Sequence, residues 1–261
     1  MANHRPRKRF GQHFLTDPGV IDAIIRAIHP TKDDVIVEIG PGQGAITDAL
    51  ARNAGHLHAV ELDRDLVARL RRQYDDNPDV TVHEADALRF DFSTLGQQIR
   101  VVGNLPYNIS TPLLFHLLKY RDNILDMHFM LQQEVVRRMA ASPGSKAWGK
   151  LSVMCQYRCS VTPLFNVPPE AFSPAPRVQS SIVRLIPHPK PPVRVANLSA
   201  FERVVNQAFS QRRKTLRNSL RSVLDAPSIE SAGIDPGIRP EMLSLEQFAA
   251  LSELLGPVNT D

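Results

Sequence analysis

The chain has 261 residues, of which 43% are hydrophobic and 22% are charged, and its mean hydropathy is −0.20. This composition is typical of a soluble globular protein and excludes disordered and collagen-like chains. No apolar run approaches the ~18–20 residues of a membrane-spanning helix, and the first residues do not resemble a secretory signal. The two cysteines, Cys155 and Cys159, are too few for a disulfide framework, so we expect a cytoplasmic protein that binds no membrane.

Positive charge is concentrated in one part of the chain. The formal net charge is only +4, but residues 135–224 contain fifteen lysines and arginines and only two acidic residues. A second basic cluster lies near the N-terminus and consists of Arg5, Arg7, Lys8 and Arg9. Charge gathered in this way favours a nucleic-acid partner over a merely solvated basic face.

The first half of the chain alternates short β-type runs with amphipathic helical runs. We expect strands at residues 35–39, 56–63, 80–82, 99–103 and 126–131. Apolar residues at helical spacing follow the first and second strands, and an apolar helix precedes the fifth. This alternation predicts an α/β fold with a doubly wound parallel sheet, which binds its ligands at the carboxyl ends of the strands.

The pattern changes after residue 160, because nine of the 21 prolines lie between Pro163 and Pro192. We expect this stretch to be largely irregular, apart from one strand at residues 178–186. Residues 188–192, with the sequence His-Pro-Lys-Pro-Pro, predict a stiff linker.

Beyond the linker the apolar residues recur only at helical spacing. They form three stripes, which are Phe201, Val204, Val205 and Ala208, then Leu216, Leu220 and Leu224, then Leu245, Phe248, Leu251 and Leu255. We therefore expect two domains, a catalytic domain at residues 1–187 and a small all-helical domain at residues 193–261.

A glycine-rich turn joins the first predicted strand to its helix. Gly40, Gly42 and Gly44 permit a tight turn and let a ligand approach the backbone closely, so Gly40 and Gly42 are candidate cofactor-binding residues. Glu61 ends the next strand, 21 residues after Gly40. In nucleoside-binding folds of this type, an acid at this position accepts hydrogen bonds from the ribose hydroxyls. Because Ala45 completes a permissive dinucleotide pattern, the turn alone is compatible with either a dinucleotide or another nucleoside cofactor.

Two further acids favour S-adenosylmethionine over a dinucleotide. Glu38 lies just before the turn, and Asp86 follows the third strand, where its carboxylate can accept the amino group of an adenine ring. No arginine cluster lies at the turn to bind a pyrophosphate, and S-adenosylmethionine contains no phosphate.

The most specific signal in the chain follows the fourth strand, where the sequence reads Asn104-Leu105-Pro106-Tyr107. An adenine amine is a poor nucleophile because its lone pair is delocalised into the ring. The Asn104 side-chain carbonyl and the Leu105 main-chain carbonyl can hold both amine hydrogens and favour the pyramidal nitrogen that attacks a methyl group. Pro106 stiffens this turn, and Tyr107 offers a ring for base stacking.

These motifs together resemble those of the bacterial small-subunit ribosomal RNA adenine dimethyltransferases. The resemblance runs through nearly the whole chain, from Gln12-His13-Phe14-Leu15 through EIGPGQG, ELD, GNLPYNIS and Ala171-Phe172-Ser173-Pro174 to Gln211-Arg212-Arg213-Lys214-Thr215. It implies a Rossmann-like class I methyltransferase sheet with a small helical C-terminal domain. It also implies dimethylation of two adjacent adenosines near the 3′ end of small-subunit rRNA, within the immature small subunit.

The resemblance implies roles for individual residues. Cofactor contacts are implied at His13, Leu15, Gly40, Glu61, Asp86 and Asn104. The family usually has asparagine where His13 stands, although histidine also donates hydrogen bonds. Phe172, in a proline-rich loop expected to be exposed, is implied to stack on the flipped adenine opposite Tyr107.

A run of basic residues at positions 212–221 predicts an RNA-binding surface. Arg213, Arg217 and Arg221 recur every four residues and are expected on one helical face, with Arg212 and Lys214 beside them. The histidines lack metal-ligand spacing, so no metal site is expected. Two alternatives stay open: a large-subunit rRNA methyltransferase of the macrolide-resistance type, and a non-catalytic RNA-binding assembly factor. A monomer is the default expectation.

Overall fold

The computed structural model describes residues 13–106, 109–211 and 213–255. The chain divides into two compact units. The first comprises Met1–Val136 with Thr162–Pro187, and the second comprises Arg137–Val161 with His188–Asp261. The chain therefore passes between the units three times, and residues 137–161 belong to the same compact unit as the C-terminal residues.

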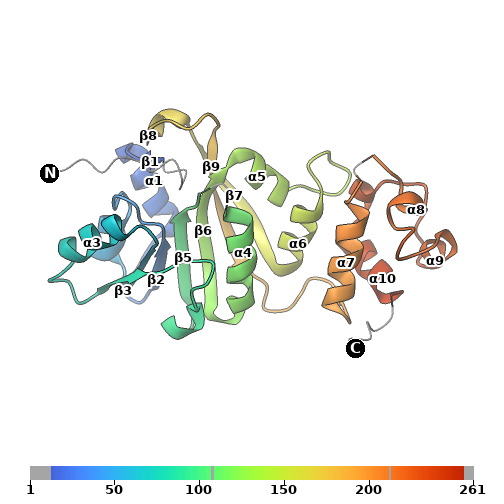
Figure 1. Ribbon diagram of the computed structural model, residues 1–261, viewed down its shortest axis with the longest axis horizontal. Helices are drawn as coiled ribbons and strands as arrows, with labels where there is room; N and C mark the ends of the chain where they lie inside the picture. The colour runs from blue at the N-terminus through green and yellow to red at the C-terminus, as the bar shows by residue number, and fades with distance from the viewer. Residues whose placement is uncertain (1–12, 107–108, 212, 256–261) are drawn as a thin grey trace. The chain divides into compact units, whose positions relative to one another are not determined.

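A seven-stranded sheet with the order β4-β3-β2-β5-β6-β9-β7 forms the centre of the fold (Figure 1). Its strands are β2 (Val35–Ile39), β3 (His56–Glu61), β4 (Val80–Glu84), β5 (Ile99–Asn104), β6 (Ile124–Gln132), β7 (Cys159–Val167) and β9 (Ser180–Pro187). The five strands from β4 to β6 pair in parallel, which confirms the predicted parallel sheet, whereas β9 pairs antiparallel with β6.

Strand β7 was not predicted by the sequence pattern, because the region after residue 160 is rich in proline. The strand contains Pro163, which cannot donate a hydrogen bond to a neighbouring strand. The strand order explains why the proline is tolerated: β7 is the last strand of the sheet, and an edge strand can leave one side of its backbone unpaired.

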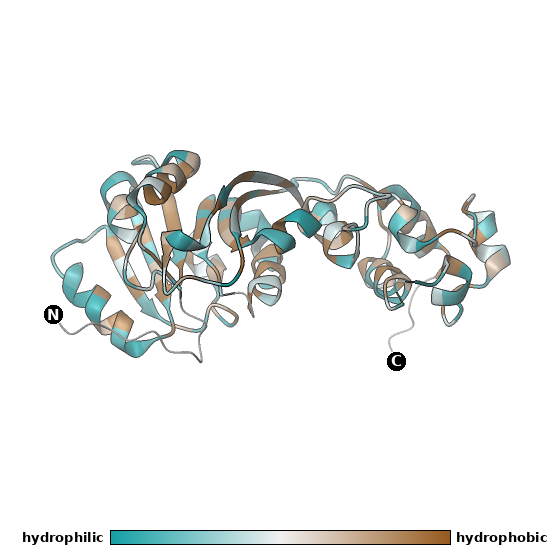
Figure 2. Ribbon diagram, turned by 90° about the horizontal axis from the view of Figure 1, so that it is seen from above, coloured by the Kyte–Doolittle hydropathy of each residue, from teal (hydrophilic) through white to brown (hydrophobic). Residues whose placement is uncertain are grey.

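Helices of the first unit cover the sheet and bury its apolar side chains. They are α1 (Pro18–Ile28), α2 (Thr47–Asn53), α3 (Arg64–Gln73) and α4 (Ser110–Leu117), and α5 (Gln133–Met139) leads into the second unit. Asp17 caps α1 by accepting a hydrogen bond from the Val20 amide, and Pro18 occupies the first turn. Ile24 and Ile28 of α1 belong to one buried cluster with Val102 of the sheet. Figure 2 shows the result as apolar strands beneath helices with polar outer surfaces.

A short two-stranded ribbon lies beside the sheet. Strand β1 (Phe14–Leu15) pairs antiparallel with β8 (Phe172–Ser173), so that Leu15 lies opposite Phe172. The main-chain amide and the hydroxyl of Thr16 both donate hydrogen bonds to the carbonyl oxygen of Ala171. Two segments more than 150 residues apart in the sequence are thereby joined.

The second unit is helical, with α6 (Lys150–Arg158), α7 (Leu198–Ala208), α8 (Leu216–Ser219), α9 (Ala226–Ser231) and α10 (Leu245–Glu253). The ring centroids of Tyr157 and Phe201 lie 4.9 Å apart, and Arg158 forms an ion pair of 2.8 Å with Glu202. These contacts join α6 to α7, so residues before the proline linker contribute to the core of this unit.

The expectation that Arg213, Arg217 and Arg221 share one helical face was wrong. Helix α8 spans only Leu216–Ser219, with Arg213 before it and Arg221 in a turn after it. The amides of Leu216 and Arg217 donate hydrogen bonds to the carbonyl oxygens of Ile238 and Pro236. In a helix that began earlier in the chain, these two amides would instead bond to carbonyl oxygens four residues before them. None of the helices in the described part of the chain is long and apolar enough to cross a membrane.

Candidate active site

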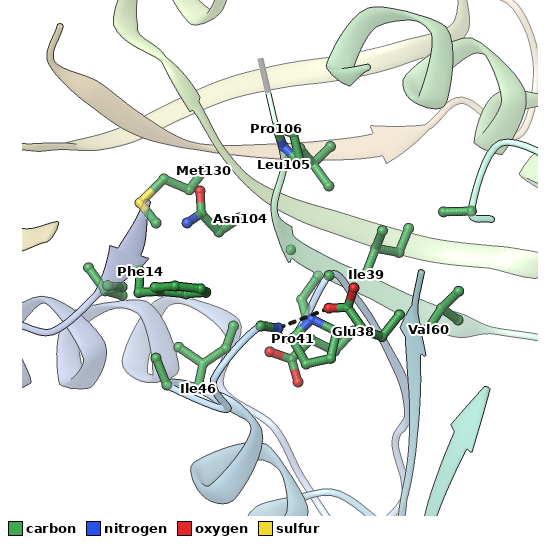
Figure 3. Close-up of a pocket in the computed structure, with 18 of the residues that line it drawn as sticks. Phe14, Glu38, Ile39, Pro41, Ile46, Val60, Asn104, Leu105, Pro106 and Met130 are labelled. Atoms are coloured by element: carbon green, nitrogen blue, oxygen red, sulfur yellow. Dashed lines mark hydrogen bonds between the residues drawn. The ribbon is translucent and has the colours of Figure 1, made fainter. Parts of the chain in front are cut away.

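A cavity of about 420 Å³ lies at the carboxyl ends of β2, β3, β4 and β5 (Figure 3). Its lining includes every described residue that the sequence predicts to bind the cofactor or the target base. These are His13, Leu15, Gly40, Gly42, Glu61, Asp86, Asn104, Leu105, Pro106 and Phe172. Tyr107 and Arg212, also predicted, lie outside the described residues, as do Arg5, Arg7, Lys8 and Arg9.

The glycine turn after β2 forms one wall of the cavity. Gly40, Gly42 and Gly44 have φ values of +66°, +59° and +87°, a region that residues with a β-carbon rarely adopt. A β-carbon on Gly42 would also lie 3.3 Å from a ring carbon of Phe14. The sequence therefore requires glycine here both for the backbone conformation and for the close approach of Phe14.

Glu61, at the end of β3, is held firmly by the main chain. Its Oε1 accepts hydrogen bonds from the amides of Leu62 and Asp63, both at 2.9 Å, and its Oε2 accepts one from Gly42 at 3.2 Å. Burial raises the pKa of the Glu61 carboxyl, and the three amides oppose that effect. The carboxylate orientation is thus fixed before any ligand binds.

Glu38, near the end of β2, is the most perturbed acid of the cavity. Its side chain is buried, and burial together with the charges of Glu61 and Asp48 raises the pKa of its carboxyl from 4.5 to about 8. Among the described residues, its Oε2 has no hydrogen-bond partner. A buried polar atom without a partner indicates that a polar ligand group or water satisfies it.

The loop after β4 and the residue after Glu61 also line the cavity. Asp86 accepts a hydrogen bond from the amide of Leu88 at 2.9 Å and lines the cavity. Leu62 also lines it, although 51% of the residue is exposed to solvent. Acidic groups beside an accessible apolar side chain suit a nucleoside, whose hydroxyl and amino groups surround a flat ring.

The turn after β5 places Asn104 and Leu105 at the cavity mouth. The Asn104 Nδ2 donates to the carbonyl oxygen of His13 at 3.3 Å, which leaves the side-chain Oδ1 as the acceptor available to a ligand. The amide of Leu105 donates to the carbonyl oxygen of Met130 at 3.2 Å, so this peptide is also held by the neighbouring strand. Figure 3 shows Asn104 and Met130 on the side of the cavity that Phe14 faces.

The ribbon of β1 and β8 brings the N-terminal motif and Phe172 into the same cavity. His13 Nδ1 donates to the carbonyl oxygen of Pro174 at 2.8 Å, so the histidine forms a contact within the protein. The expected exposure of the Phe172 loop was wrong at Phe172 itself, which is only 5% exposed. Its ring is buried because β8 pairs with β1 and places it in the core cluster that also contains Leu15 and Met130.

Several cavity residues were missed by the sequence analysis. Phe14, Leu62 and Met130 carry ordinary apolar side chains whose role depends on their place in the fold. His128 on β6 is only 3% exposed and also lines the cavity. The sequence feature that could have identified it is a histidine within the otherwise apolar strand run of residues 127–131. Burying an imidazole without hydrogen-bond partners costs free energy.

The described residues of the predicted basic surface all reach the solvent. Arg213, Lys214, Arg217 and Arg221 are all exposed in the second unit, as an RNA-binding surface requires. No group of three or more potential metal ligands occurs in the described part of the chain.

Comparison with known proteins agrees with this geometry. A family model described as ribosomal RNA adenine dimethylase matches residues 3–256. The ribosomal RNA small subunit methyltransferase A of Aromatoleum aromaticum is 56% identical over 256 residues, which cover 98% of this chain and 96% of the relative. Its counterpart in Chromohalobacter salexigens is also 56% identical, over 95% of this chain and 91% of the relative.

Solved structures show the same fold. The crystal structure of a dimethyladenosine transferase from Plasmodium falciparum has a TM-score of 0.78 and 26% identity, and covers 92% of this chain and 96% of that one. The 23S rRNA methyltransferase ErmE has a TM-score of 0.74 and 27% identity, and covers 94% of this chain and 100% of that one. The chain therefore belongs to the ribosomal RNA adenine dimethylase family and is an S-adenosylmethionine-dependent rRNA adenine dimethyltransferase with a Rossmann-like fold.

Proposed function

We propose that the enzyme dimethylates the exocyclic amines of two adjacent adenosines near the 3′ end of small-subunit rRNA. The products are N(6),N(6)-dimethyladenosines, and the substrate is the immature small subunit late in its assembly. The observation that carries the proposal is the single cavity that joins a nucleoside-type wall, at Glu61 and Asp86, to the acceptor turn at Asn104 and Leu105.

The residues of the cavity suit S-adenosylmethionine. Glu61 and Asp86 provide acceptors for ribose hydroxyls and an adenine amino group, while the unpartnered Glu38 Oε2 provides a further polar contact. The main chain at Gly40 and Gly42 permits close approach of a ligand, and His13 and Leu15, in and just before β1, also line the cavity. When bound, S-adenosylmethionine supplies an electrophilic methyl group on a sulfonium.

Catalysis rests on alignment of the target amine. Asn104 Oδ1 and the Leu105 carbonyl oxygen accept the two amine hydrogens and turn the nitrogen lone pair toward the methyl carbon. As the N–C bond forms, the C–S bond breaks and its electron pair stays on sulfur. The methylated ammonium then gives a proton to water. Phe172 and Tyr107 hold the adenine ring by stacking.

The small subunit is a better-supported target than the large one. The curated relatives that are 54–56% identical carry the name ribosomal RNA small subunit methyltransferase A, whereas ErmE, a 23S rRNA methyltransferase, is 27% identical. The presence of Glu61, Asp86 and the complete Asn104–Tyr107 turn argues against a non-catalytic assembly factor.

The basic C-terminal part is assigned to RNA binding. Exposed arginine and lysine side chains at residues 213, 214, 217 and 221 supply charge for the phosphates of folded rRNA, and Arg212 belongs to the same run. We assign residues 1–187 to catalysis and residues 193–261 to rRNA contacts, in a cytoplasmic monomer.

The decisive experiment uses small ribosomal subunits from cells that lack this enzyme. Purified enzyme and radiolabelled S-adenosylmethionine are added, and the modified bases are mapped by mass spectrometry of rRNA fragments. We expect two adjacent dimethyladenosines near the 3′ end of the small-subunit rRNA. Labelling of large subunits instead, or of other small-subunit bases, contradicts the proposal.

A further inference from the structure

Two histidines on neighbouring strands at one edge of the sheet contact each other. His58 lies on β3 and His83 on β4, which is the last strand at this end of the sheet. Val60 lies opposite His83 and two residues after His58, so both imidazoles project from the same face. His58 Nδ1 lies 3.1 Å from His83 Nε2. The spacing of histidines in the sequence does not reveal this pair, because its members are 25 residues apart.

Neighbouring rings hold the two imidazoles in this arrangement. The ring centroids of His56 and His58 lie 4.5 Å apart, and those of His83 and Phe90 lie 5.2 Å apart. His56 Nε2 lies 3.0 Å from Thr81 Oγ1, so this third histidine has a polar contact of its own. All three histidines are only half-buried, so solvent reaches the cluster.

The distance between the two nitrogens suits a shared metal ion as well as a shared proton. In the hydrogen bond that joins them, one nitrogen carries the proton and the other accepts it. A tetrahedral zinc ion lies about 2.0–2.1 Å from each imidazole nitrogen, which places two such nitrogens about 3.3 Å apart. The observed 3.1 Å is close to this spacing, so a small rotation of the rings lets an ion replace the shared proton.

The pair supplies nitrogen ligands only. Glu84, the acidic residue next to His83, projects from the opposite face of β4. There its carboxylate forms ion pairs with Arg64 at 3.0 Å and with Arg71 at 3.9 Å. Among the residues that the structure describes, no third histidine, cysteine or carboxylate completes a metal-binding group with the pair. Imidazole ligands without carboxylates favour zinc, copper and nickel over Mg²⁺ and Ca²⁺.

Both imidazoles are in the form that binds metals. Burial lowers the pKa of His58 to about 4, together with the charges of His56 and His83. Burial also lowers the pKa of His83, with further contributions from His56 and Arg71. The rings are therefore neutral at physiological pH, and a neutral imidazole retains the lone pair that coordinates a metal.

We propose that His58 and His83 form a binding site for a divalent transition-metal ion, for which zinc is the probe. The ion bonds to His58 Nδ1 and His83 Nε2, and water fills its remaining positions. It thereby links β3, which ends at Glu61, to β4, which precedes Asp86. Neither histidine lines the cavity at the strand ends, so this site is independent of the proposed methyl transfer.

Zinc titration of matched variants tests the assignment. The full chain without an affinity tag is measured by calorimetry as wild type, His58→Val, His83→Phe and His56→Val, with Mg²⁺ as the control ion. Valine suits a strand, and phenylalanine at position 83 can pack against Phe90 as the imidazole does. His29→Asn is the control for surface histidines, because His29 is exposed and asparagine tolerates its φ of 51°.

We expect His58→Val and His83→Phe each to weaken zinc binding by more than the roughly tenfold to hundredfold that loss of an outer-shell partner costs. His56→Val and His29→Asn bind zinc as the wild type does, and Mg²⁺ does not bind. Zinc raises the melting temperature of the wild type but not of the two pair variants, because the ligands come together only in the folded state. Wild-type zinc affinity in both pair variants overturns the proposal, as does an equal loss in His56→Val.

NMR of the wild-type protein identifies the nitrogens that bind the metal, even if a variant does not fold. In protein labelled with ¹⁵N-histidine, zinc shifts the resonances of His58 Nδ1 and His83 Nε2, while the second nitrogen of each ring keeps its proton. Zinc that shifts only other histidines, or none, shows that the pair is a hydrogen bond alone and contradicts the proposal.

Discussion

Asn104 illustrates how a single side chain is prepared for its chemistry by a distant segment. Its amide nitrogen donates to the carbonyl oxygen of His13, which lies 91 residues earlier in the chain. That bond orients the amide so that Oδ1 is the free acceptor for an amine hydrogen. Pro106 follows directly in the acceptor turn and fixes its own φ, which limits the conformations of the turn.

Replacing Asn104 with alanine tests this role. We expect Asn104→Ala to slow methyl transfer by about two to three orders of magnitude, as loss of one preorganised polar contact does in other enzymes. Affinity for S-adenosylhomocysteine, measured by calorimetry, stays within about threefold. Asn53→Ala, at an exposed asparagine of α2, serves as the control. Wild-type turnover in Asn104→Ala rules out the amine-holding role.

Glu38 makes the stability of the fold depend on pH. Its pKa is about 8 in the folded protein and 4.5 without the fold, so the folded state favours the protonated form. The associated stabilisation is fully present below pH 4.5 and is lost as the pH rises toward 8.

Glu38→Gln removes this dependence, because the amide is neutral at every pH. We expect the free energy of unfolding of the wild type, relative to Glu38→Gln, to fall between pH 5 and pH 8, by up to ~1.4 kcal/mol per pH unit. Urea unfolding of both proteins across this range measures the difference, in which the contributions of the shared histidines cancel. A constant difference shows that Glu38 has no raised pKa.

At the scale of elements, the basic surface is made of a short helix and its flanking turns. Helix α8 spans four residues. Leu216, its first residue, and Leu220, which directly follows it, are both fully buried. Anchoring by these leucines leaves Arg217 exposed beside Arg213 and Arg221. The surface therefore does not depend on one regular helical face.

Charge reversal at Arg213 and Arg217 tests whether this surface binds rRNA. We expect the double variant to bind small subunits more weakly and to reduce the slope of log K against log salt by about 2, roughly one for each lost phosphate contact. Reversal of Arg69 and Arg72, exposed residues of α3 outside the basic stretch, provides the control. An unchanged slope in the first variant assigns Arg213 and Arg217 to ordinary solvated surface.

At the scale of the whole molecule, the proline linker does not mark the limit of the second compact unit. That unit also contains residues 137–161, and α6 contacts α7 through Tyr157, Phe201 and the Arg158–Glu202 ion pair. The C-terminal helices thus depend on a segment that precedes the linker in the chain.

A cut in the linker makes this dependence measurable. A site-specific protease sequence is inserted after Pro192, an exposed residue, and the purified protein is cleaved. We expect the two fragments to elute together on gel filtration, because the α6–α7 contacts survive the cut. Substitution of both Tyr157 and Phe201 by alanine should release the C-terminal fragment. Separation of the fragments in the cleaved wild type refutes the prediction.

The amino-acid sequence determined the parallel part of the sheet and most of the cavity. Both follow from local patterns: Glu61 and Asn104 end strands and Asp86 follows one, and parallel strands with helical crossovers present those ends at one edge. The sequence also predicted the glycine turn, because the positive φ values of this turn favour glycine over every other residue type.

Tertiary structure alone decided the remaining features. The burial of Phe172 depends on pairing with Leu15, and β7 survives Pro163 only because it lies at the sheet edge. The burial of His128, with both ring nitrogens unpartnered among the described residues, depends on the side chains that the fold places around it. Such contacts join residues far apart in the chain, and their energies come from burial and geometry that no local pattern records.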